Sequence, residues 1–336
     1  MADYRDIGKS PRERAKALLA QMTLEEKVGQ MIQLDYKRTE EQMRSVWAGK
    51  RGLGSYLHVK GREADEMQKL ALQTRLGIPI LFGIDCIRGH ALNVNATVFP
   101  TQLAMAQSFD RSMLFDVGRV SAAEVRADGV QWTFSPVFCI ARDIRWGRVD
   151  ETFGEDPYLI GELGAAMVKG YQNDFQDNSC VLACAKHYIG YGEATGARDP
   201  VDAQLTERKI RELFLPPFIK ALQAGCKTVM TAYGSIDGTP MTAHTRLLRQ
   251  VLKQELGFDG FVVTDYSNVD SLGWQQNVAE NDEQAALLAA IAGNDMIMHA
   301  PGFYESAIRL VQSGRLNIEV IDQAVLRILE QKFMLG

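Results

Sequence analysis

The sequence lacks a long hydrophobic run and an excess of positive charge, and each absence excludes a class of protein. No apolar stretch reaches the roughly 18 residues that a membrane-spanning helix needs. The 336 residues include 37 Lys and Arg against 42 Asp and Glu, a net charge of -5, and the basic residues are scattered. We therefore expect no membrane insertion and no nucleic-acid partner, because binding a phosphate backbone requires a basic patch.

Signals for export, disulfides and metal binding are also scarce. Residues 1–16 are polar and charged and do not resemble a signal peptide, so we expect a cytoplasmic protein or an exported one whose leader was removed. The five histidines are dispersed, and no His-x-His or His-Glu-x-x-His motif occurs. The cysteines form an odd, dispersed set that favours buried thiols, and we expect neither a metal nor a cofactor: Cys86, Cys139, Cys180, Cys184 and Cys226.

Three further sequence features are missing. The glycine-rich segment 190–198, GYGEATGAR, lacks both the Gly-Lys-Ser/Thr ending of a phosphate-binding loop and the spacing of a dinucleotide-binding one. No Gly-x-Ser-x-Gly elbow supports acyl transfer through a serine. No internal repeat, low-complexity segment or linker divides the chain, so we expect a single domain.

What the sequence does contain is a regular alternation of short apolar runs and amphipathic helical patterns. Helices are predicted after the capping residues Asp110, Thr206 and Thr245, the last of these ending on a glycine, and a final helix covers 317–333. Near-continuous apolar strands alternating with helices indicate a parallel sheet covered on both faces. Eight such units favour an α/β fold of the (β/α)8 TIM-like barrel type. The strands are predicted at 28–34, 54–59, 80–86, 132–138, 182–188, 228–234, 260–266 and 296–300.

Polar and aromatic residues follow these predicted strands, where a barrel carries its chemistry. Carboxylates, a Lys-His pair and aromatics suit a sugar site, because charged groups fix hydroxyls and rings pack against sugars. A retaining glycosidase also needs an ionised carboxylate as nucleophile, and Asp265 at the end of a short, rigid strand suits that role. The strand-end residues are His58, Asp85, Lys186, His187, Tyr233, Asp265, Tyr266 and His299.

Five ordered motifs resemble one known family. The chain is similar to the N-terminal barrel of glycoside hydrolase family 3, the group of β-glucosidases and related exo-acting enzymes, from QMTLEEKVGQMI (21–32) to the end. We therefore expect residues 1–336 to form that barrel domain, without the α/β sandwich domain that follows it in two-domain members. The motifs are GIDCIRGH (83–90), FSPVFCIARDIRWGRVDETFGEDPYL (134–159), AKHYIGYG (185–192), TVMTAYGSIDGTPMTAH (228–244) and GFDGFVVTDY (257–266).

The resemblance implies a role for each matching residue. Asp265 would be the nucleophile of a retaining, exo-acting β-glucosidase. Tyr233 would lie beside it, and Tyr266 stands where the family often has Trp. By contrast, the charged residues around the RWGR motif are expected to form scaffold ion pairs, with Trp146 used for packing: Arg142, Arg145, Glu155 and Asp156. The sugar-hydroxyl binders would be Asp85, Arg148, Lys186 and His187.

No proton donor can be assigned from the sequence. In two-domain family members the acid/base Glu comes from the second domain, and in single-domain N-acetylhexosaminidases a His supplies the proton. Here Tyr191 replaces the second His of the KHFPGHG-like motif and 193–200 contain no His, which closes the hexosaminidase route. The donor could come from a missing domain or another chain, including a homo-oligomer partner, or from a local carboxylate, for which Glu193 is the candidate.

Other readings of the sequence stay open. The chain could be a carbohydrate-binding barrel with little turnover, or its specificity could be that of a β-xylosidase. A barrel that acts on sugar phosphates would need a basic phosphate site after the seventh and eighth strands. The segments 267–283 and 299–305 contain no Lys or Arg, which argues against that reading. The expected partner is a small β-linked carbohydrate.

Overall fold

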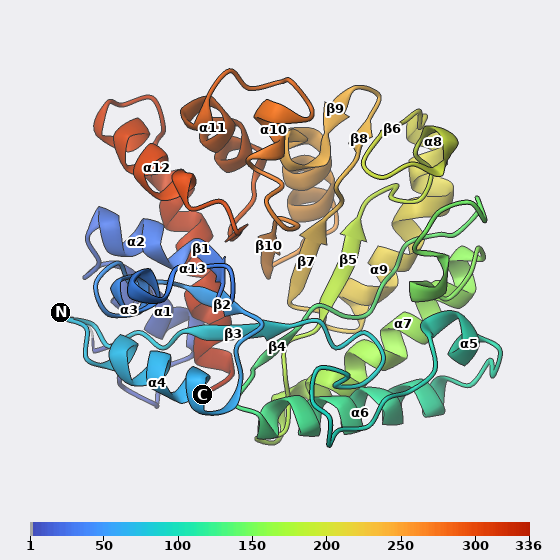
Figure 1. Ribbon diagram of the computed structural model, residues 1–336, viewed down its shortest axis with the longest axis horizontal. Coiled ribbons are helices and arrows are strands. Elements are labelled where there is room, and N and C mark those ends of the chain that lie inside the picture. Colours follow the sequence, from blue (N-terminus) through green and yellow to red (C-terminus); the bar gives the residue numbers. More distant parts are fainter. Residues whose placement is uncertain (1–2) are drawn as a thin grey trace.

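The computed structural model describes residues 3–336, which form a ring of parallel strands surrounded by helices (Figure 1). Each ring strand overlaps one of the eight predicted apolar runs, so all eight strand predictions are confirmed in number and order. The ring strands are β1 (Ile32–Asp35), β2 (Ser55–Leu57), β3 (Leu81–Ile84), β4 (Trp132–Thr133), β5 (Cys184–Tyr188), β7 (Thr228–Thr231), β10 (Phe261–Val263) and β11 (Ile297–Met298).

Two parallel sheets make up this ring. One sheet has the order β11-β1-β2-β3-β4 and the other the order β10-β7-β5. Isolated parallel bridges join β4 to β5, at Trp132↔Leu182, and β10 to β11, at Val263↔Met296. Neighbouring strands are therefore parallel all the way round, as the predicted (β/α)8 barrel in a single domain requires.

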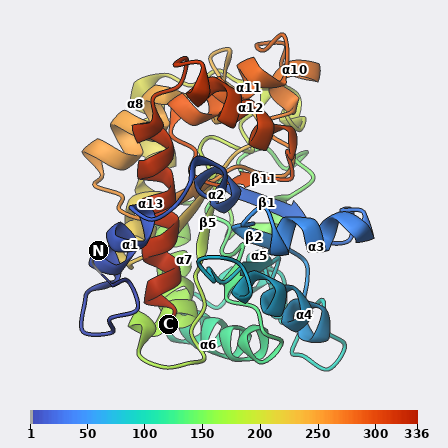
Figure 2. The ribbon, with the colours of Figure 1, turned by 90° about the vertical axis from the view of Figure 1, so that its left-hand side faces the viewer.

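The helices cover the outside of the ring. Gly118 allows α6 and α7 to pack closely, because a Cβ at Gly118 would lie 2.6 Å from the Met167 carbonyl oxygen. The helix α13 lies along α1 (Figure 2). The helices are α1 (Pro11–Leu19), α2 (Leu24–Gln30), α3 (Glu41–Gly49), α4 (Gly61–Leu72), α5 (Gln102–Ala106), α6 (Arg111–Ala127), α7 (Pro157–Gln172), α8 (Glu207–Lys209), the π-type helix η4 (Ile210–Phe214), α9 (Leu215–Gln223), the π-type helix η6 (Arg246–Glu255), α10 (Ser271–Trp274), α11 (Asp282–Ala292), α12 (Gly302–Gln312) and α13 (Ile318–Met334).

The predicted helix starts have different outcomes. The Asp110 side chain caps α6 by accepting the amides of Ser112 and Met113, and the Thr206 side chain caps α8. Thr245 precedes η6 as predicted but makes no side-chain cap, and the cap at the end of that helix is Leu256, with Gly257 one residue later at φ +67°. The final helix lies where the sequence places it.

The first strand is shorter than predicted. Residues 28–30 belong to α2, because the side chain of Thr23 accepts the amide of Glu26 and the Glu26 carboxylate accepts the amide of Thr23. This capping box starts a helix that continues through Gln30 before β1 begins at Ile32. The predicted start of this strand at residue 28 was therefore wrong.

A small extra sheet that the sequence did not predict covers part of one end of the ring. It pairs β6 (Asp202–Ala203) with β8 (Ser235–Ile236) in parallel, and β8 with β9 (Thr239–Pro240) as an antiparallel hairpin. These strands belong to the segments that follow β5 and β7, so they hold the two segments together at the carboxyl ends of the ring strands. Two-residue strands carry too little periodicity to be recognised in a sequence.

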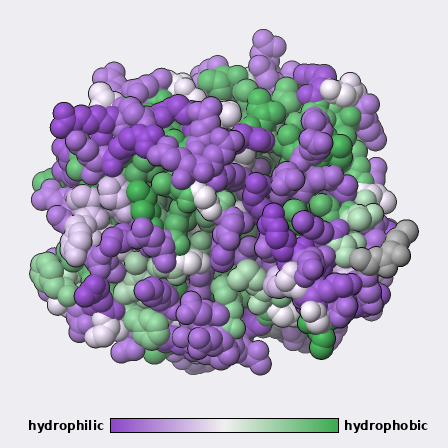
Figure 3. Space-filling model, turned by 180° about the vertical axis from the view of Figure 1, so that it is seen from behind, coloured by the Kyte–Doolittle hydropathy of each residue, from purple (hydrophilic) through white to green (hydrophobic). Residues whose placement is uncertain are grey.

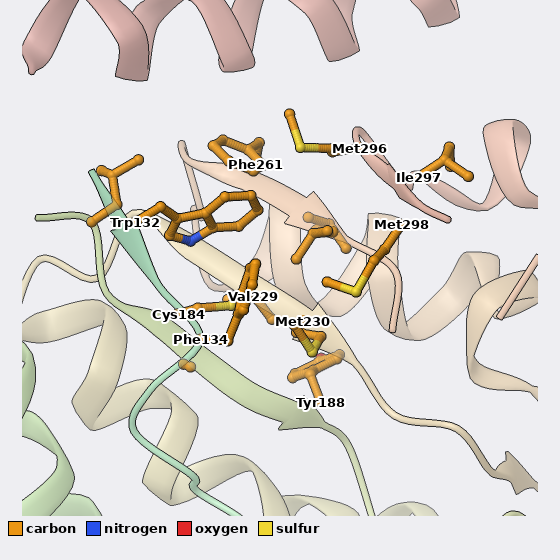
Figure 4. Packing of buried hydrophobic residues seen from close by; sticks show 14 of the residues in the cluster. Trp132, Phe134, Cys184, Tyr188, Val229, Met230, Phe261, Met296, Ile297 and Met298 are labelled. Carbon is orange, nitrogen blue, oxygen red and sulfur yellow. The ribbon is translucent and has the colours of Figure 1, made fainter. Parts of the chain in front are cut away.

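Large apolar side chains fill the space between the strands (Figure 4). Trp132 packs edge-on against Phe134 and Phe261, with ring centroids 4.7 and 5.1 Å away, and its indole N–H donates to Thr228 Oγ1 at 2.8 Å. All five cysteines are buried and free, as predicted. On the outer surface, hydrophilic residues cover most of the face opposite Figure 1, and hydrophobic ones form smaller groups between them (Figure 3). Within residues 3–336, no helix has both the length and the apolar character that crossing a bilayer requires.

Candidate active site

The residues singled out in the sequence follow the strands at one end of the ring. Asp85 follows β3, Tyr233 comes two residues after β7, and Asp265 comes two residues after β10. Lys186 and His187 lie within β5, and Arg148 precedes the short helix η1 (Val149–Glu151) in the segment after β4. The fold therefore brings together side chains that are up to 180 residues apart in the sequence, as Asp85 and Asp265 are.

Asp85 is held by two basic side chains. Lys186 Nζ donates to Asp85 Oδ1 at 2.8 Å, and His58 Nε2 lies 3.0 Å from Asp85 Oδ2. Burial alone would raise the pKa of Asp85, but the charge of Lys186 and the contact with His58 outweigh it and hold the pKa well below its ordinary value. Asp85 is therefore a permanent acceptor, able to bind hydroxyls but not to deliver a proton.

Asp265 has a different environment. One carboxylate oxygen, Oδ1, accepts the backbone amide of Tyr266 at 2.7 Å, whereas Oδ2 is buried without a hydrogen-bond donor among the described residues. Burial raises the pKa of Asp265 to about 6, although the charges of Lys186 and Arg148 oppose the shift. This carboxylate is positioned by the backbone, is ionised near neutral pH and has one oxygen that no hydrogen bond engages, which are properties that suit a nucleophile.

His187 lies between this carboxylate and the interior. Its Nε2 is 3.6 Å from Asp265 Oδ2, and its Nδ1 is 3.4 Å from the sulfur of Cys139. Burial, helped by the charges of Arg148 and Lys186, places the pKa of His187 well below its ordinary value. The imidazole is therefore neutral, and its approach to Asp265 is not an ion pair.

Arg148 belongs to a second polar network. It forms a bidentate ion pair with Glu151, through Nε at 2.8 Å and Nη2 at 2.7 Å, and its Nη1 donates to the Tyr191 hydroxyl at 3.4 Å. Tyr191 in turn donates to the Asp199 carboxylate and packs edge-on against His187, with ring centroids 4.9 Å apart. The network fixes the guanidinium of Arg148, because every member is held by at least one neighbour.

The two tyrosines lie in different surroundings. Burial, followed by the charge of Asp265, raises the pKa of Tyr233, so its phenol keeps its proton near the carboxylate. Tyr266 stacks on His299 with ring centroids 4.6 Å apart, and Arg38 lies 5.3 Å from the centroid of the Tyr266 ring. The ring of Tyr266 is therefore already in contact with two side chains from other segments.

Glu193 is engaged by cations. Its Oε2 accepts from Lys209 Nζ at 2.7 Å, and its Oε1 lies 3.5 Å from Arg142 Nε. Arg145 pairs with Asp143, whereas Asp156 caps α7 through its side chain and forms no ion pair among the described residues. Both oxygens of Glu193 thus lie close to cations, as in a structural ion pair.

Sequence reasoning missed several residues of this site. Asp35 ends β1 and accepts weakly from the Tyr266 hydroxyl at 3.5 Å, but the prediction ended that strand one residue earlier. Cys139 directly follows the fourth predicted strand and contacts His187. Its position after a strand could have marked it as a site residue, but all five cysteines were predicted to be core thiols. Glu151 ends the short helix η1 and Asp199 lies in a loop, and no periodicity marks either residue.

No cluster of three or more His, Cys, Asp or Glu suited to a metal ion occurs among residues 3–336. The charges that do meet here are two carboxylates, Asp85 and Asp265, and two cations, Lys186 and Arg148. Asp85 pairs with Lys186 and His58 and keeps 38% of its side chain exposed, whereas Asp265 Oδ2 is buried without a hydrogen-bond partner among the described residues. Such a site can bind a polyhydroxylated molecule and attack an electrophilic carbon with Asp265.

Comparison with known proteins identifies the family. The sequence model described as the glycosyl hydrolase family 3 N-terminal domain matches residues 23–331. The chain belongs to glycoside hydrolase family 3. The family resemblance predicted from the five motifs is confirmed.

Similar proteins are named β-glucosidases and β-xylosidases. The chain is 33% identical to the periplasmic β-glucosidase of Salmonella typhimurium, over 95% of this chain and 41% of that protein. It is also 33% identical to the lysosomal β-glucosidase of Dictyostelium discoideum, over 95% of this chain and 43% of the other. A β-xylosidase of Formosa agariphila is 34% identical over 81% of this chain. The chain therefore spans about two-fifths of the length of these relatives.

Solved structures show the same fold. A β-glucosidase involved in saponin metabolism from intestinal bacteria is 45% identical, with a TM-score of 0.88 over 95% of this chain and 42% of that one. The β-glucosidase of Listeria innocua in complex with glucose is 36% identical, with a TM-score of 0.89 over 97% of this chain and 47% of the other. The barrel architecture is thus shared with family 3 β-glucosidases.

Proposed function

We propose that this barrel is the nucleophile-bearing part of a retaining, exo-acting β-glucosidase that cleaves terminal β-linked sugars. The observation that carries the proposal is the state of Asp265, a buried carboxylate that follows a strand. One of its oxygens accepts a backbone amide, and the other has no hydrogen-bond partner among the described residues. Family membership and the names of the relatives support glucosides as the substrate class.

In the proposed first step, an oxygen of Asp265 forms a bond to the anomeric carbon while the bond from that carbon to the glycosidic oxygen breaks. The departing oxygen takes a proton from an acid, leaving a covalent glycosyl-enzyme. In the second step, water gives up a proton to the same group and attacks the anomeric carbon, and the Asp265 carboxylate is released. Net retention follows from the two displacements.

The remaining polar groups would hold the sugar. Asp85 offers a fixed acceptor, Lys186 a fixed donor, and Arg148 a guanidinium oriented by Glu151. Donors and acceptors in fixed positions discriminate hydroxyl orientations, because a wrongly placed hydroxyl leaves a buried polar group unpaired. His187, Tyr233 and Tyr266 complete the proposed binding surface around Asp265.

We propose that the acid/base comes from a second domain or another chain rather than from Glu193. Both oxygens of Glu193 face cations, at 2.7 Å from Lys209 and 3.5 Å from Arg142, which suits a structural carboxylate. The relatives named as glucosidases are more than twice as long as the segment that this chain matches. For location we propose the cytoplasm or an exported site, and the relatives named periplasmic and lysosomal support the second.

A β-xylosidase is the second candidate. The 34% identity to a β-xylosidase over 81% of this chain favours it, and xyloside and glucoside share every ring hydroxyl that a family site would bind. The two substrates differ by the hydroxymethyl group alone. Rates with matched aryl β-glucoside and β-xyloside decide between them.

The experiment that tests the proposal is covalent trapping. A 2-deoxy-2-fluoro glucoside with an activated leaving group needs no proton donor in the first step, so this chain should react with it as it stands. Mass spectrometry should find one added fluorosugar on the peptide that contains Asp265. The variant Asp265→Ala should gain no mass, whereas Asp259→Asn, at an exposed aspartate paired with Lys227, should be trapped like the wild type.

Absence of trapping, together with saturable binding of glucose, would instead identify a carbohydrate-binding barrel without turnover. A label on another carboxylate would overturn the assignment of Asp265. A clean gain of one sugar on Asp265 would establish the nucleophile independently of the origin of the acid.

A further inference from the structure

Cys139 lies behind the proposed site, in the segment that follows β4. It is buried, with 4% of its surface exposed, and its sulfur makes three contacts with His187, to the backbone amide, the backbone carbonyl and the ring. The sulfur accepts the backbone amide of His187 at 3.2 Å and lies 3.4 Å from the ring atom Nδ1. The opposite ring nitrogen, Nε2, faces Asp265 Oδ2 at 3.6 Å.

A neutral imidazole carries its single hydrogen on one nitrogen, and the partner of the other nitrogen decides which one. A thiol has one hydrogen to donate and lone pairs to accept. Here the sulfur already accepts the His187 amide, and of the two acceptors near its own hydrogen, Nδ1 at 3.4 Å is nearer than the His187 carbonyl oxygen at 4.0 Å. Burial raises the pKa of the Cys139 thiol to about 12, which keeps that hydrogen on the sulfur at neutral pH.

The contact with Asp265 favours the same tautomer. With hydrogen on Nδ1, the lone pair of Nε2 would face a carboxylate oxygen of Asp265 at 3.6 Å. With hydrogen on Nε2, an N–H dipole faces that oxygen and lies next to the position of the reacting sugar. The negative charge of Asp265 therefore favours the Nε2–H tautomer over the Nδ1–H tautomer, although the ring has the same position in both.

We propose that Cys139 is a positioning residue whose thiol donates to Nδ1 of His187 and fixes the Nε2–H tautomer, so that His187 is a hydrogen-bond donor beside Asp265. This inference rests on the proposed function for its catalytic consequence, but the tautomer itself can be measured without any substrate. Cys139 acts through His187 and touches neither the nucleophile nor the sugar.

The test compares Cys139→Ser, which keeps a donor, with Cys139→Ala, which removes it. Cys226→Ala is the matched control, because Cys226 is also buried but its sulfur contacts the carbonyl oxygens of Ala183 and Thr228 instead. Nitrogen-15 NMR of histidine-labelled protein distinguishes a protonated ring nitrogen from an unprotonated one. The signals of His187 are assigned by their loss in His187→Gln.

In wild type, Cys139→Ser and Cys226→Ala, His187 should carry its hydrogen on Nε2 alone. In Cys139→Ala, part of the protein should carry this hydrogen on Nδ1 instead. The rate of trapping by the 2-fluoro glucoside should fall about tenfold in Cys139→Ala, the worth of one hydrogen bond, and recover in Cys139→Ser. A wild type with hydrogen on Nδ1, or an Nε2–H tautomer unchanged in Cys139→Ala, would overturn the proposal. Failure of trapping in wild type would count against the proposed function only.

Discussion

Lys186 Nζ lies 2.8 Å from Asp85 Oδ1, which joins a residue of β5 to a residue that follows β3. Lys186 is almost fully buried, whereas 38% of the Asp85 side chain is exposed. Removal of the cation should therefore leave a partly desolvated carboxylate without its main partner. We expect Lys186→Met to cost about 1–2 kcal/mol in the free energy of unfolding, less than a fully buried pair because Asp85 still reaches solvent.

Denaturant unfolding of Lys186→Met, Asp85→Asn and the double variant checks this expectation. The double variant should be less destabilised than the sum of the two single variants, because each single change leaves the other partner unpaired. Additive effects would show that the two side chains do not stabilise each other.

Asp265 should reduce stability at neutral pH. Its pKa in the folded protein is raised from 3.8 to about 6, so the folded state holds an extra proton between these values. The stability contributed by the protonated form is present below about pH 4 and is lost as the pH rises through about 6. Asp265→Asn should therefore raise the unfolding free energy by about 2–3 kcal/mol at pH 7.5 and change it little at pH 3.8. Equal effects at both pH values would contradict the raised pKa.

The same pKa should govern the rate of trapping. The reaction with an activated 2-fluoro glucoside needs Asp265 ionised and needs no acid, so its rate should rise through a single midpoint near pH 6. In Lys186→Met the midpoint should move upward, because a positive charge that favours the carboxylate is lost. Inactivation rates from pH 4.5 to 8 measure both midpoints. A wild-type midpoint near 4 would mean that burial does not control the nucleophile.

Gly54 should tolerate no side chain. A Cβ at this position would lie 1.9 Å from the backbone carbonyl oxygen of Gln30, where α2 packs at the start of β2. We expect Gly54→Ala to destabilise the fold by about 2–4 kcal/mol through this overlap. Gly49→Ala is the control, since the added methyl group meets only ordinary contact, with Leu70 Cβ at 3.8 Å, and should be neutral or stabilise α3 by up to about 1 kcal/mol. Thermal unfolding of both variants measures the two effects. A loss of stability in Gly54→Ala alone would show that steric overlap, and not the change from glycine to alanine as such, destabilises the fold.

The fold was readable from the sequence because its strongest signals are local. Eight apolar runs mark the eight ring strands, and Asp110 and Thr206 announce helices through side-chain caps. The error at residues 28–30 arose because Val28 continues an apolar run while the capping box at Thr23 and Glu26 demands a helix. Val28 can be buried in a helix as well as in a strand, so its hydrophobicity does not decide between them. The capping hydrogen bonds at the helix start do decide, and the segment is helical.

The site was readable only in part. The sequence points to Asp85 and Asp265 because a barrel brings the carboxyl ends of its strands together. It does not tell which carboxylate is paired with basic side chains and which has an oxygen without a hydrogen-bond partner. That difference depends on Lys186 and His58 around Asp85, and on a single amide at Asp265. The partners of Arg148 and His187 lie in a one-turn helix or in loops, or were counted as core, and the hydrophobic pattern identifies none of them.

The proposed site draws its residues from both sheets of the ring. Tyr233, Asp265 and the Lys186-His187 pair belong to strands of the three-stranded sheet or follow them directly, whereas Asp85 follows a strand of the five-stranded sheet. Backbone hydrogen bonds join the two sheets at both seams, among them Thr133 N–H to the Leu182 carbonyl at 2.9 Å and Thr264 N–H to the Met296 carbonyl at 3.0 Å, so Asp265 and Asp85 are held in one continuous ring. The contact between Lys186 and Asp85 adds a side-chain link between the two sheets, and a sugar bound by both residues would contact both sheets at once.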